Sequence, residues 1–375
     1  MTRRPRSDDA ARLRVRVALS PRPWRTRVPR RRPRHRHALA LALVAPLVVL
    51  LAACSGGAAG VPDPAPSDND TGGGTAASST RYPLTIDDCG FDVTFDAAPE
   101  RVVTIKSSTT EMLLALGLGD RIVASAFLDG PVPDTLADAA ASVPAVAEPM
   151  SDQVPGAEAV LGVEPDLVYA GWESNLTADG AGDRDTLAQL GVATYVSPSA
   201  CKDAAYMPNP LTFDDVFAEI TEVGQIFDAP DAAADLVADQ QATLDGVEAD
   251  DRGLTALWYS SGDDIPYVGA GIGAPQMIMD AVGLENVAGD VEDTWTSYAW
   301  EEAIAADPDV LVLVDAAWNT ADAKIERLES NPATAEMTAV REGRYLRVPF
   351  PASEAGVRNV DAVVDLAEQL EALDL

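Results

Sequence analysis

Histidine is nearly missing from this chain, which has only His35 and His37 among its 375 residues. Imidazole is the proton carrier of Ser/His/Asp and Cys/His hydrolases and a frequent ligand of zinc. From residue 38 onward, these three kinds of site therefore lack their central side chain. A G-x-S-x-G elbow, a Walker loop and a regular G-x-G-x-x-G turn are missing too. The glycine-rich run at 269–274 is better interpreted as a turn before a helix.

Basic side chains are scarce after residue 53. Fourteen of the 27 Lys and Arg residues lie in residues 1–53, together with two of the 60 Asp and Glu residues. The rest of the chain keeps 13 basic and 58 acidic residues, a formal balance of −45. So much negative charge would repel phosphate backbones, and the sequence therefore predicts no nucleic-acid partner.

The longest apolar run has 14 residues, from Ala38 to Leu51, and follows an arginine-rich segment. It is too short to span a bilayer stably. A basic segment, a short apolar core and small residues before Cys54 are together typical of a lipoprotein signal peptide. We expect residues 1–53 to be removed and Cys54 to become the lipidated N-terminus, on the outer face of the cell membrane. An ordinary secretory signal with a chance cysteine is the alternative.

The chain has three cysteines, so acylation of Cys54 would leave Cys89 and Cys201 as an even pair. Disulfides persist in an oxidising extracytoplasmic compartment, and we expect these two residues to be joined. Two buried free thiols are the alternative.

The domain organisation follows from composition and hydrophobic periodicity. Residues 54–81 combine the lipidated cysteine with a Gly, Ser, Ala, Pro and Asp segment that predicts a flexible linker. Beyond it, short apolar runs such as RVVTIK, DLVYAG and VLVLVD alternate with helical patterns, which predicts an α/β fold with two largely parallel, Rossmann-like lobes. Two consecutive helical patterns fill 211–250. We assign the lobes to 82–228 and 251–375, joined by a helix over 229–250 that would span about 30 Å.

One motif occurs in both halves. Glu158, six residues and Pro165-Asp166 precede a strand in the first half, and Glu301 stands in the same relation to Pro308-Asp309 in the second. A short helix stopped by proline and feeding a strand explains the pattern, with the glutamate favoured near the helix start. Its recurrence predicts two lobes with matched exposed carboxylates.

In these segments the chain resembles the substrate-binding proteins of ABC importers for siderophores, cobalamin and haem. The resemblance covers nearly all of residues 82–375 and depends on APERVVTIKSSTTEMLLALGLGDRIVASA, EAVLGVEPDLVYAG and WEEAIAADPDVLVLV. It implies two α/β lobes joined by a single long helix, a ligand cleft between them, a monomer, no enzymatic activity and no cofactor. It also implies an ABC permease and its ATPase as partners, with Glu158 and Glu301 docking on the permease. Glu302 could share the second role.

The strand-to-helix loops supply the candidate ligand contacts. Ser108 and Glu111 fit an S-x-x-E capping box, and such a helix start can offer N–H groups to an anion. Aromatic faces with a few polar groups suit a planar, conjugated ligand. The candidates are Lys106, Ser107, Ser108, Thr109, Trp172, Glu173, Asn175, Arg184, Trp258, Tyr259, Trp295 and Trp318.

The few basic residues narrow the choice of ligand. Lys106, Arg184, Lys202 and Arg358 are candidate partners for a phosphate or carboxylate. Within the family, TIKSSTTEMLLALGLGDRI, FLDGPVPD, YAGWESNLTADGAG and YVSPSACK look like a subgroup assigned to a precursor of the deazaflavin coenzyme F420. A ferric siderophore is the second candidate ligand, haem and cobalamin also fit an aromatic cleft with hydrogen-bond donors, and no Cys or His pattern indicates a bare metal ion.

Two other functions remain open at this stage. A surface-tethered glycosidase can work with two carboxylates and no histidine, but these would have to face each other across a cleft. A cell-surface adhesion module is the third option.

Overall fold

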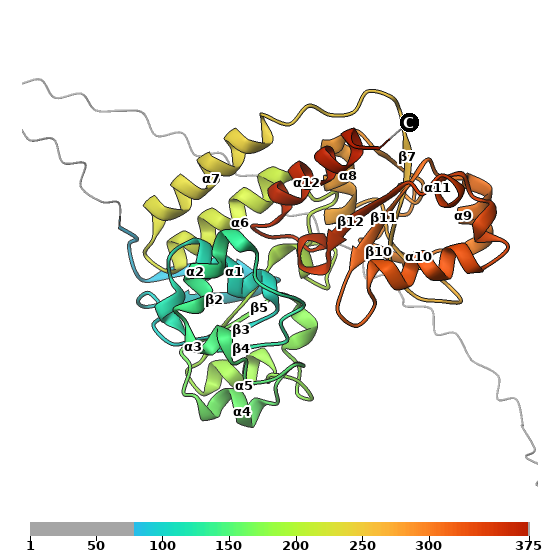
Figure 1. The fold of residues 1–375 in the computed structure, drawn as a ribbon. Coiled ribbons are helices and arrows are strands. Elements are labelled where there is room, and N and C mark those ends of the chain that lie inside the picture. The colour runs from blue at the N-terminus through green and yellow to red at the C-terminus, as the bar shows by residue number, and fades with distance from the viewer. Residues whose placement is uncertain (1–78, 374–375) are drawn as a thin grey trace, which may run out of the picture. The chain divides into compact units, whose positions relative to one another are not determined.

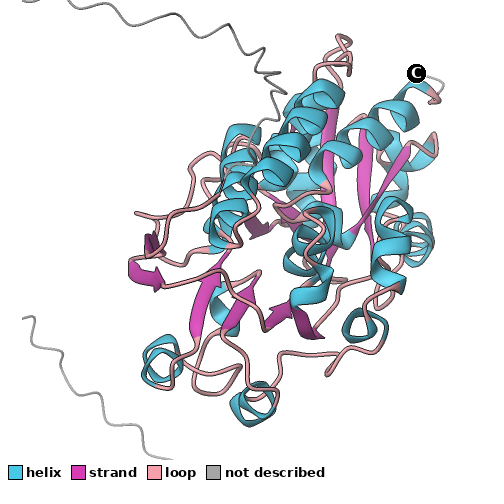
Figure 2. Cartoon of the chain, turned by 90° about the vertical axis from the view of Figure 1, so that its left-hand side faces the viewer, coloured by secondary structure: helices cyan, strands magenta, loops and turns pink. Residues whose placement is uncertain are grey.

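The computed structural model describes residues 79–373, which belong to one compact unit. The predicted signal peptide, Cys54 and most of the predicted linker lie outside the described residues. Within 79–373, helices flank the strands of two main sheets (Figures 1 and 2), and this confirms the predicted α/β class. None of the helices in that range has the length and apolar character needed to cross a bilayer.

The first sheet has four parallel strands in the order β4-β3-β5-β6. We call the residues packed around it the first lobe. Its strands are β3 (Val102–Ile105), β4 (Ile122–Ala126), β5 (Leu167–Ala170) and β6 (Ala193–Val196). The residues of β3 and β5 are all buried, as expected for a parallel sheet covered on both faces. The helices of this lobe are α1 (Ser107–Ala115), α2 (Ala137–Ala141), α3 (Pro144–Ala147), α4 (Ala157–Gly162) and α5 (Arg184–Gln189).

The second sheet has six strands, in the order β10-β8-β7-β11-β12 with β9 beside β7. The residues around it form the second lobe. Its strands are β7 (Thr255–Ser261), β8 (Tyr267–Gly269), β9 (Glu285–Asn286), β10 (Trp295–Ser297), β11 (Val310–Asp315) and β12 (Tyr345–Pro349). Strands β7, β9, β11 and β12 run parallel, whereas β8 and β10 form an antiparallel edge that the sequence did not predict. The helices are α8 (Ala274–Val282), α9 (Trp300–Ala306), α10 (Ala321–Ser330), α11 (Thr338–Arg341) and α12 (Asn359–Glu371).

A hairpin that the sequence analysis missed precedes the first sheet. It pairs β1 (Leu84–Asp88) with β2 (Phe91–Phe95) around a two-residue turn. Both turn residues, Cys89 and Gly90, have positive φ angles of 53° and 83°, the conformation that tight hairpins favour. Cys89 is joined by a disulfide to Cys201, the pairing that the sequence predicted, and the hairpin is thereby tied to the loop after β6.

Two helices connect the sheets, α6 (Phe213–Ile226) and α7 (Pro230–Leu244). They pack closely, since a Cβ placed on Gly224 would come within 2.4 Å of the Ala233 Cβ. Helix α7 leads into the second lobe (Figure 1), but it has 15 residues and a length of about 22 Å, shorter than the helix expected over 229–250. It ends at a turn around Gly246, a poor helix former.

The repeated motif is a structural repeat. In both copies the residue before the proline has a positive φ, 49° at Glu164 and 44° at Asp307, where the helix ends. The aspartate after each proline then accepts backbone N–H groups at the start of the adjacent strand, Asp166 beside β3 and Asp309 beside β7. Glu158 and Glu301 lie in the first turns of the two equivalent helices, α4 and α9.

Candidate functional site

A cavity of about 240 Å³ lies between the two lobes. Loops after β3, β5 and β6 line it from the first lobe, and loops around β8, β10 and β12 line it from the second. Carboxyl ends of parallel strands are the usual location of ligand sites in such sheets. Its lining residues are Ser108, Gly171, Trp172, Ser174, Ser199, Ala200, Cys201, Lys202, Met207, Pro208, Leu211, Ile272, Gly273, Ala274, Thr294, Trp295, Ser353, Glu354 and Ala355.

Three of the predicted ligand contacts line this cavity: Ser108, Trp172 and Trp295. Both indoles are half-buried, so each is partly covered by protein and partly open. The Trp295 ring stacks on Tyr267, with ring centroids 6.0 Å apart and an interplanar angle of 14°. This stack fixes the orientation of one aromatic wall, on the side of the second lobe.

The loop that carries Trp172 is held by two other predicted residues. The backbone N–H of Trp172 donates to Asn175 Oδ1 at 3.2 Å, and Asn175 is buried. The Glu173 carboxylate accepts the backbone N–H of Lys202, which joins the loops after β5 and β6. Asn175 and Glu173 thus position the loop and do not line the cavity.

Directly behind Trp172, Lys106 is fully buried with two carboxylates. Its ammonium forms an ion pair with Asp129 and lies 3.6 Å from Glu354 Oε2. Glu354 Oε1 accepts the indole N–H of Trp172 at 3.0 Å. Because Glu354 follows β12 and Lys106 follows β3, these contacts bridge the two lobes. Lys106 is therefore paired within the protein and not exposed to the cavity, contrary to the role expected from the sequence.

Three aromatic rings surround the same ammonium. The Lys106 Nζ lies 3.5 Å from a Trp172 ring centroid, 4.6 Å from Phe127 and 5.0 Å from Phe350. Cation–π attraction of this kind is stronger when the cation is desolvated. Lys106 thereby supports the inner face of Trp172, whose indole forms part of the cavity wall.

Burial changes the proton affinity of these carboxyl groups. It raises the pKa of Glu354 to about 7 despite the opposing effect of Lys106. Burial also raises the pKa of Asp129, again opposed by Lys106. One ammonium cannot fully compensate two buried carboxylates, so near neutral pH the cluster takes up a proton more readily than isolated acids would.

The start of α1 differs from the predicted capping box. Ser108 lies inside the helix, and Lys106 in the capping position makes no side-chain cap. Glu111 instead forms a buried double hydrogen bond with Arg358 of the second lobe. Asp129 occupies the helix start, where its carboxylate accepts the Ser107 N–H at 3.4 Å. The Ser107 N–H, one of the groups expected to bind a ligand anion, is thus engaged by the protein.

Arg184, another predicted cation, lies away from the cavity in a buried ion pair with Asp88. Its Nε donates to Thr194 Oγ1 at 2.9 Å, and its guanidinium packs 4.1 Å from the Phe91 ring centroid. Burial raises the pKa of Asp88 to about 7, opposed by Arg184. Arg184 therefore anchors the β1–β2 hairpin to β6.

Five further predicted contacts lie outside the cavity lining. Ser107 is buried at the start of α1, where its hydroxyl oxygen accepts the backbone N–H of Asp129 at 2.9 Å. Thr109 is buried in α1 and donates to the Ile105 carbonyl. Trp258 and Tyr259 do not follow a strand as expected but lie within β7, fully buried, because β7 is a central strand covered on both faces. Trp318 is 61% exposed and packs edge-on against Phe350.

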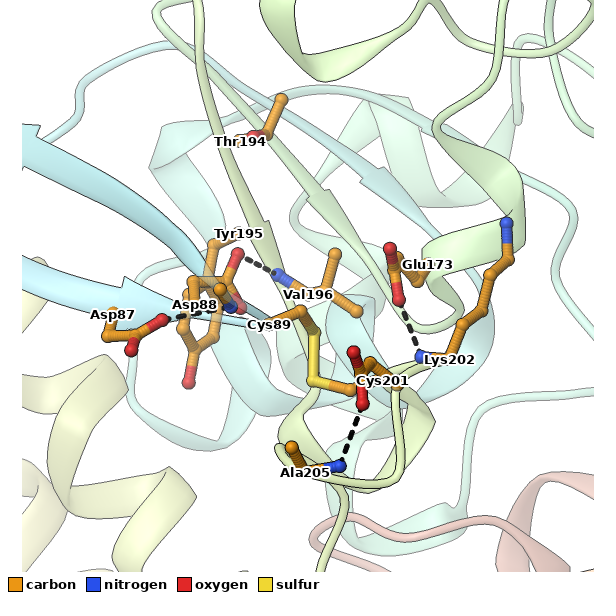
Figure 3. The surroundings of a disulfide bond; sticks show 12 residues. Asp87, Asp88, Cys89, Glu173, Thr194, Tyr195, Val196, Cys201, Lys202 and Ala205 are labelled. Atoms are coloured by element: carbon orange, nitrogen blue, oxygen red, sulfur yellow. Dashed lines mark hydrogen bonds between the residues drawn. A yellow bond between two sulfur atoms is a disulfide. The ribbon is translucent and has the colours of Figure 1, made fainter. Parts of the chain in front are cut away.

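Lys202 is the predicted cation that does line the cavity. It directly follows Cys201 of the disulfide, and its side chain is exposed (Figure 3). Its backbone is held by Glu173, whereas its ammonium has no hydrogen-bond or ion-pair partner within residues 79–373.

The two candidate docking residues belong to helices α4 and α9. Glu158 and Glu301 are exposed, each in the first turn of a helix on a different lobe (Figure 1). Glu302 is exposed beside Glu301. Neither Glu158 nor Glu301 lines the cavity.

Sequence reasoning missed the loop after β12, which brings Ser353 and Glu354 to the cavity. The position of this loop in the sequence could have indicated its role. It links the predicted strand YLRVPF to the last helix, and other cavity loops also link a strand to a helix. Asp129 was also missed, although it lies in the FLDGPVPD segment.

Two α/β lobes, connected through α6 and α7 and lining one cavity between them, define a protein that holds a small molecule between its lobes. The chain belongs to the periplasmic binding protein family, whose model matches residues 102–352. Within it, the chain is a substrate-binding protein of ABC importers of the siderophore, cobalamin and haem class.

Relatives and solved structures support this placement. An uncharacterised ABC transporter substrate-binding lipoprotein, YvrC of Bacillus subtilis, is 27% identical over 77% of this chain and 86% of its own. A cobalamin-binding protein of Halobacterium salinarum is 26% identical over 71% of this chain and 67% of its own. A periplasmic binding protein from Veillonella parvula has a TM-score of 0.68 and 27% identity, covering 78% of this chain and 98% of that one. An ABC-type Fe3+-hydroxamate transport protein from Saccharomonospora viridis has a TM-score of 0.66 and 28% identity, covering 77% and 99%.

Proposed function

We propose that this protein captures a planar or chelated organic ligand in the inter-lobe cavity and delivers it to an ABC permease and its ATPase. The observation that carries the proposal is the cavity itself, bounded by both lobes and walled by the indoles of Trp172 and Trp295. The signal sequence supports an extracytoplasmic protein anchored through a lipid on Cys54.

The aromatic and hydroxyl lining of the cavity favours a deazaflavin coenzyme precursor as the ligand. A cavity of about 240 Å³ is smaller than the roughly 300 to 1,000 Å³ of most ligand pockets. It suits a flat ring system better than a bulky corrinoid. Hydroxyl groups supply hydrogen bonds around the two indoles, from Ser108, Ser174, Ser199, Thr294 and Ser353. A ferric siderophore is the second candidate, because Fe3+-hydroxamate transport is the printed function of one structural neighbour.

Docking on the permease is assigned to Glu158 and Glu301. Both carboxylates are exposed, lie in the first turns of equivalent helices and are outside the cavity lining. Arginines on a partner could pair with them, since exposed charges steer association and set orientation. Their matched positions support one contact per lobe.

A glycosidase is less consistent with this geometry. Glycoside hydrolysis by carboxylates needs two acids flanking the bond to be cleaved. Among the described residues that line the cavity there is one carboxylate, Glu354, and it is paired with Lys106.

Intrinsic tryptophan fluorescence of the mature chain tests the proposal. The chain is titrated with a deazaflavin precursor, ferric hydroxamate and catecholate siderophores, haem and cobalamin, with correction for ligand absorbance. We expect saturable quenching by the deazaflavin. Trp295→Leu should weaken binding at least tenfold, because one aromatic wall is lost, whereas Trp318→Leu is the control outside the cavity. Absence of a response to every compound would count against the proposal.

A further inference from the structure

The charges around the cavity are already compensated, with one exception. Two charged residues line it, Glu354 and Lys202. Glu354 is engaged by Lys106 and by the Trp172 indole. The Lys202 ammonium has no partner within the described part of the chain. It is therefore the charge in the lining that remains available to a ligand.

The other candidate cations cannot take this role without breaking buried pairs. Lys106 is held by Asp129, and Arg184 by Asp88. Arg358 is held by Glu111. Removing one partner from a buried ion pair is costly, so a ligand that captured any of these cations would leave a buried carboxylate uncompensated.

Two contacts hold the backbone at Lys202 in place. The disulfide holds the preceding residue to the β1–β2 hairpin, with a Cα–Cα distance of 5.3 Å, and Glu173 accepts the Lys202 N–H. Figure 3 shows the ammonium end of Lys202 directed away from the disulfide, with no contact drawn to it. Fixing the root of a long side chain reduces the ordering cost of binding, because fewer torsions have to be frozen.

Hydroxyl groups of the same wall complete a site for an anionic oxygen group. Ser174 and Ser199 line the cavity together with Lys202. A carboxylate or phosphate ester accepts hydrogen bonds from such hydroxyls and pairs with the ammonium. Glu354 and the strongly acidic surface would repel a ligand with several negative charges.

We propose that Lys202 binds the single anionic oxygen group, a carboxylate or a phosphate ester, of a planar ligand held by the indoles. This inference rests on the proposed function and adds the charge of the ligand. Selection among related ligands would then depend on the Lys202 side chain, which lies on the loop held by the Cys89–Cys201 disulfide.

The experiment compares three probes that share one deazaflavin ring system: one with a neutral ribityl side chain, one ending in a phosphate ester and one ending in a carboxylate. Calorimetry gives their affinities for the mature chain and for Lys202→Gln, Lys202→Arg and Arg341→Gln. Arg341 is the control for loss of one positive charge, since it lies in α11 of the second lobe and outside the cavity lining.

We expect wild type to bind at least one anionic probe about tenfold more tightly than the neutral probe, and Lys202→Gln to reduce this preference to within about twofold. Affinity for the neutral probe should stay unchanged. Lys202→Arg and Arg341→Gln should keep the preference. The anionic probe that wild type prefers identifies the group as phosphate or carboxylate.

The failures are separable. Equal wild-type affinity for all three probes, or a preference that survives in Lys202→Gln, overturns the role of Lys202 and leaves the proposed function standing. A wild-type chain that binds none of the probes overturns the deazaflavin proposal and the role of Lys202 together.

Discussion

Replacing Lys106 with methionine should destabilise the protein severely, whereas the same replacement at Lys202 should not. Both are lysines of cavity loops, but Lys106 is 0% exposed between two carboxylates and Lys202 is exposed without a partner. The two variants therefore compare the loss of a buried ammonium with the loss of a solvated one in the same region of the fold.

The magnitude follows from what Lys106→Met leaves behind. Asp129 and Glu354 would remain buried without their cation, and breaking a buried pair costs about 3–5 kcal/mol. The three rings around the ammonium would lose their cation as well. Lys202→Met should change stability by less than about 0.5 kcal/mol, as is usual at exposed positions.

Glu354→Gln should have a much smaller effect than Lys106→Met, because it removes the excess negative charge of the cluster. The oxygen of the glutamine side-chain amide can still accept the indole N–H of Trp172, and Asp129 still pairs with the Lys106 ammonium. We also expect Glu354→Gln to recover part of the loss when it is combined with Lys106→Met.

Denaturant unfolding of the mature chain at pH 8, followed by far-UV circular dichroism, measures these free energies. The double-mutant cycle of Lys106→Met and Glu354→Gln should show coupling of at least about 1 kcal/mol. Equal stabilities of Lys106→Met and Lys202→Met, or additive effects in the cycle, would refute the reasoning.

Three further predictions follow from the fold and the site. Replacing Cys89 and Cys201 by serine should cost up to about 5 kcal/mol of unfolding free energy, because the bond closes a loop of 112 residues; a loss below about 1 kcal/mol in denaturant unfolding would contradict this. Glu219 of α6 is buried and accepts a hydrogen bond from the Tyr169 hydroxyl at 2.9 Å. Burial raises the pKa of Glu219 from 4.5 to about 7, so its contribution to stability is fully present below pH 4.5 and is lost as the pH rises through 7. Glu219→Gln should remove on the order of 3 kcal/mol of this pH dependence, measured by unfolding at pH 4.5 and 8, and an unchanged slope would count against it. Glu158→Ala with Glu301→Ala should abolish uptake by cells and leave ligand affinity intact; reduced affinity would argue against docking.

The regular part of the fold was predictable because its strands are buried on both faces. Continuous apolar runs such as VLVLVD and DLVYAG predicted strands that the structure shows as β11 and β5. The β1–β2 hairpin was missed because its strands mix polar with apolar residues, and the β8–β10 edge because its strands have only three residues each. Helix α7 was predicted too long because its polar face continues into the turn around Gly246.

The cavity loops were predictable, but the state of their charges was not. Predicted strand ends placed Ser108 and Trp172 near one another, as the structure shows, whereas Trp295, also a candidate, begins the unpredicted strand β10. The partner of Arg358 is Glu111, 247 residues away in the sequence. No local pattern reveals such a pairing, because it depends on how the lobes close on each other.

These pairings bear on how the cavity can discriminate among ligands. The contacts of Glu354 with Trp172 and Lys106, and the Arg358–Glu111 pair, all join the first lobe to the second. Separating the lobes would expose these groups to water. When the lobes are closed, the charged groups pair with one another and are not available to bind a ligand. The closed cavity then offers indole faces, hydroxyl groups and one free ammonium. Shape and aromatic contact would therefore supply most of the affinity, and a single charge would select among ligands of the same shape.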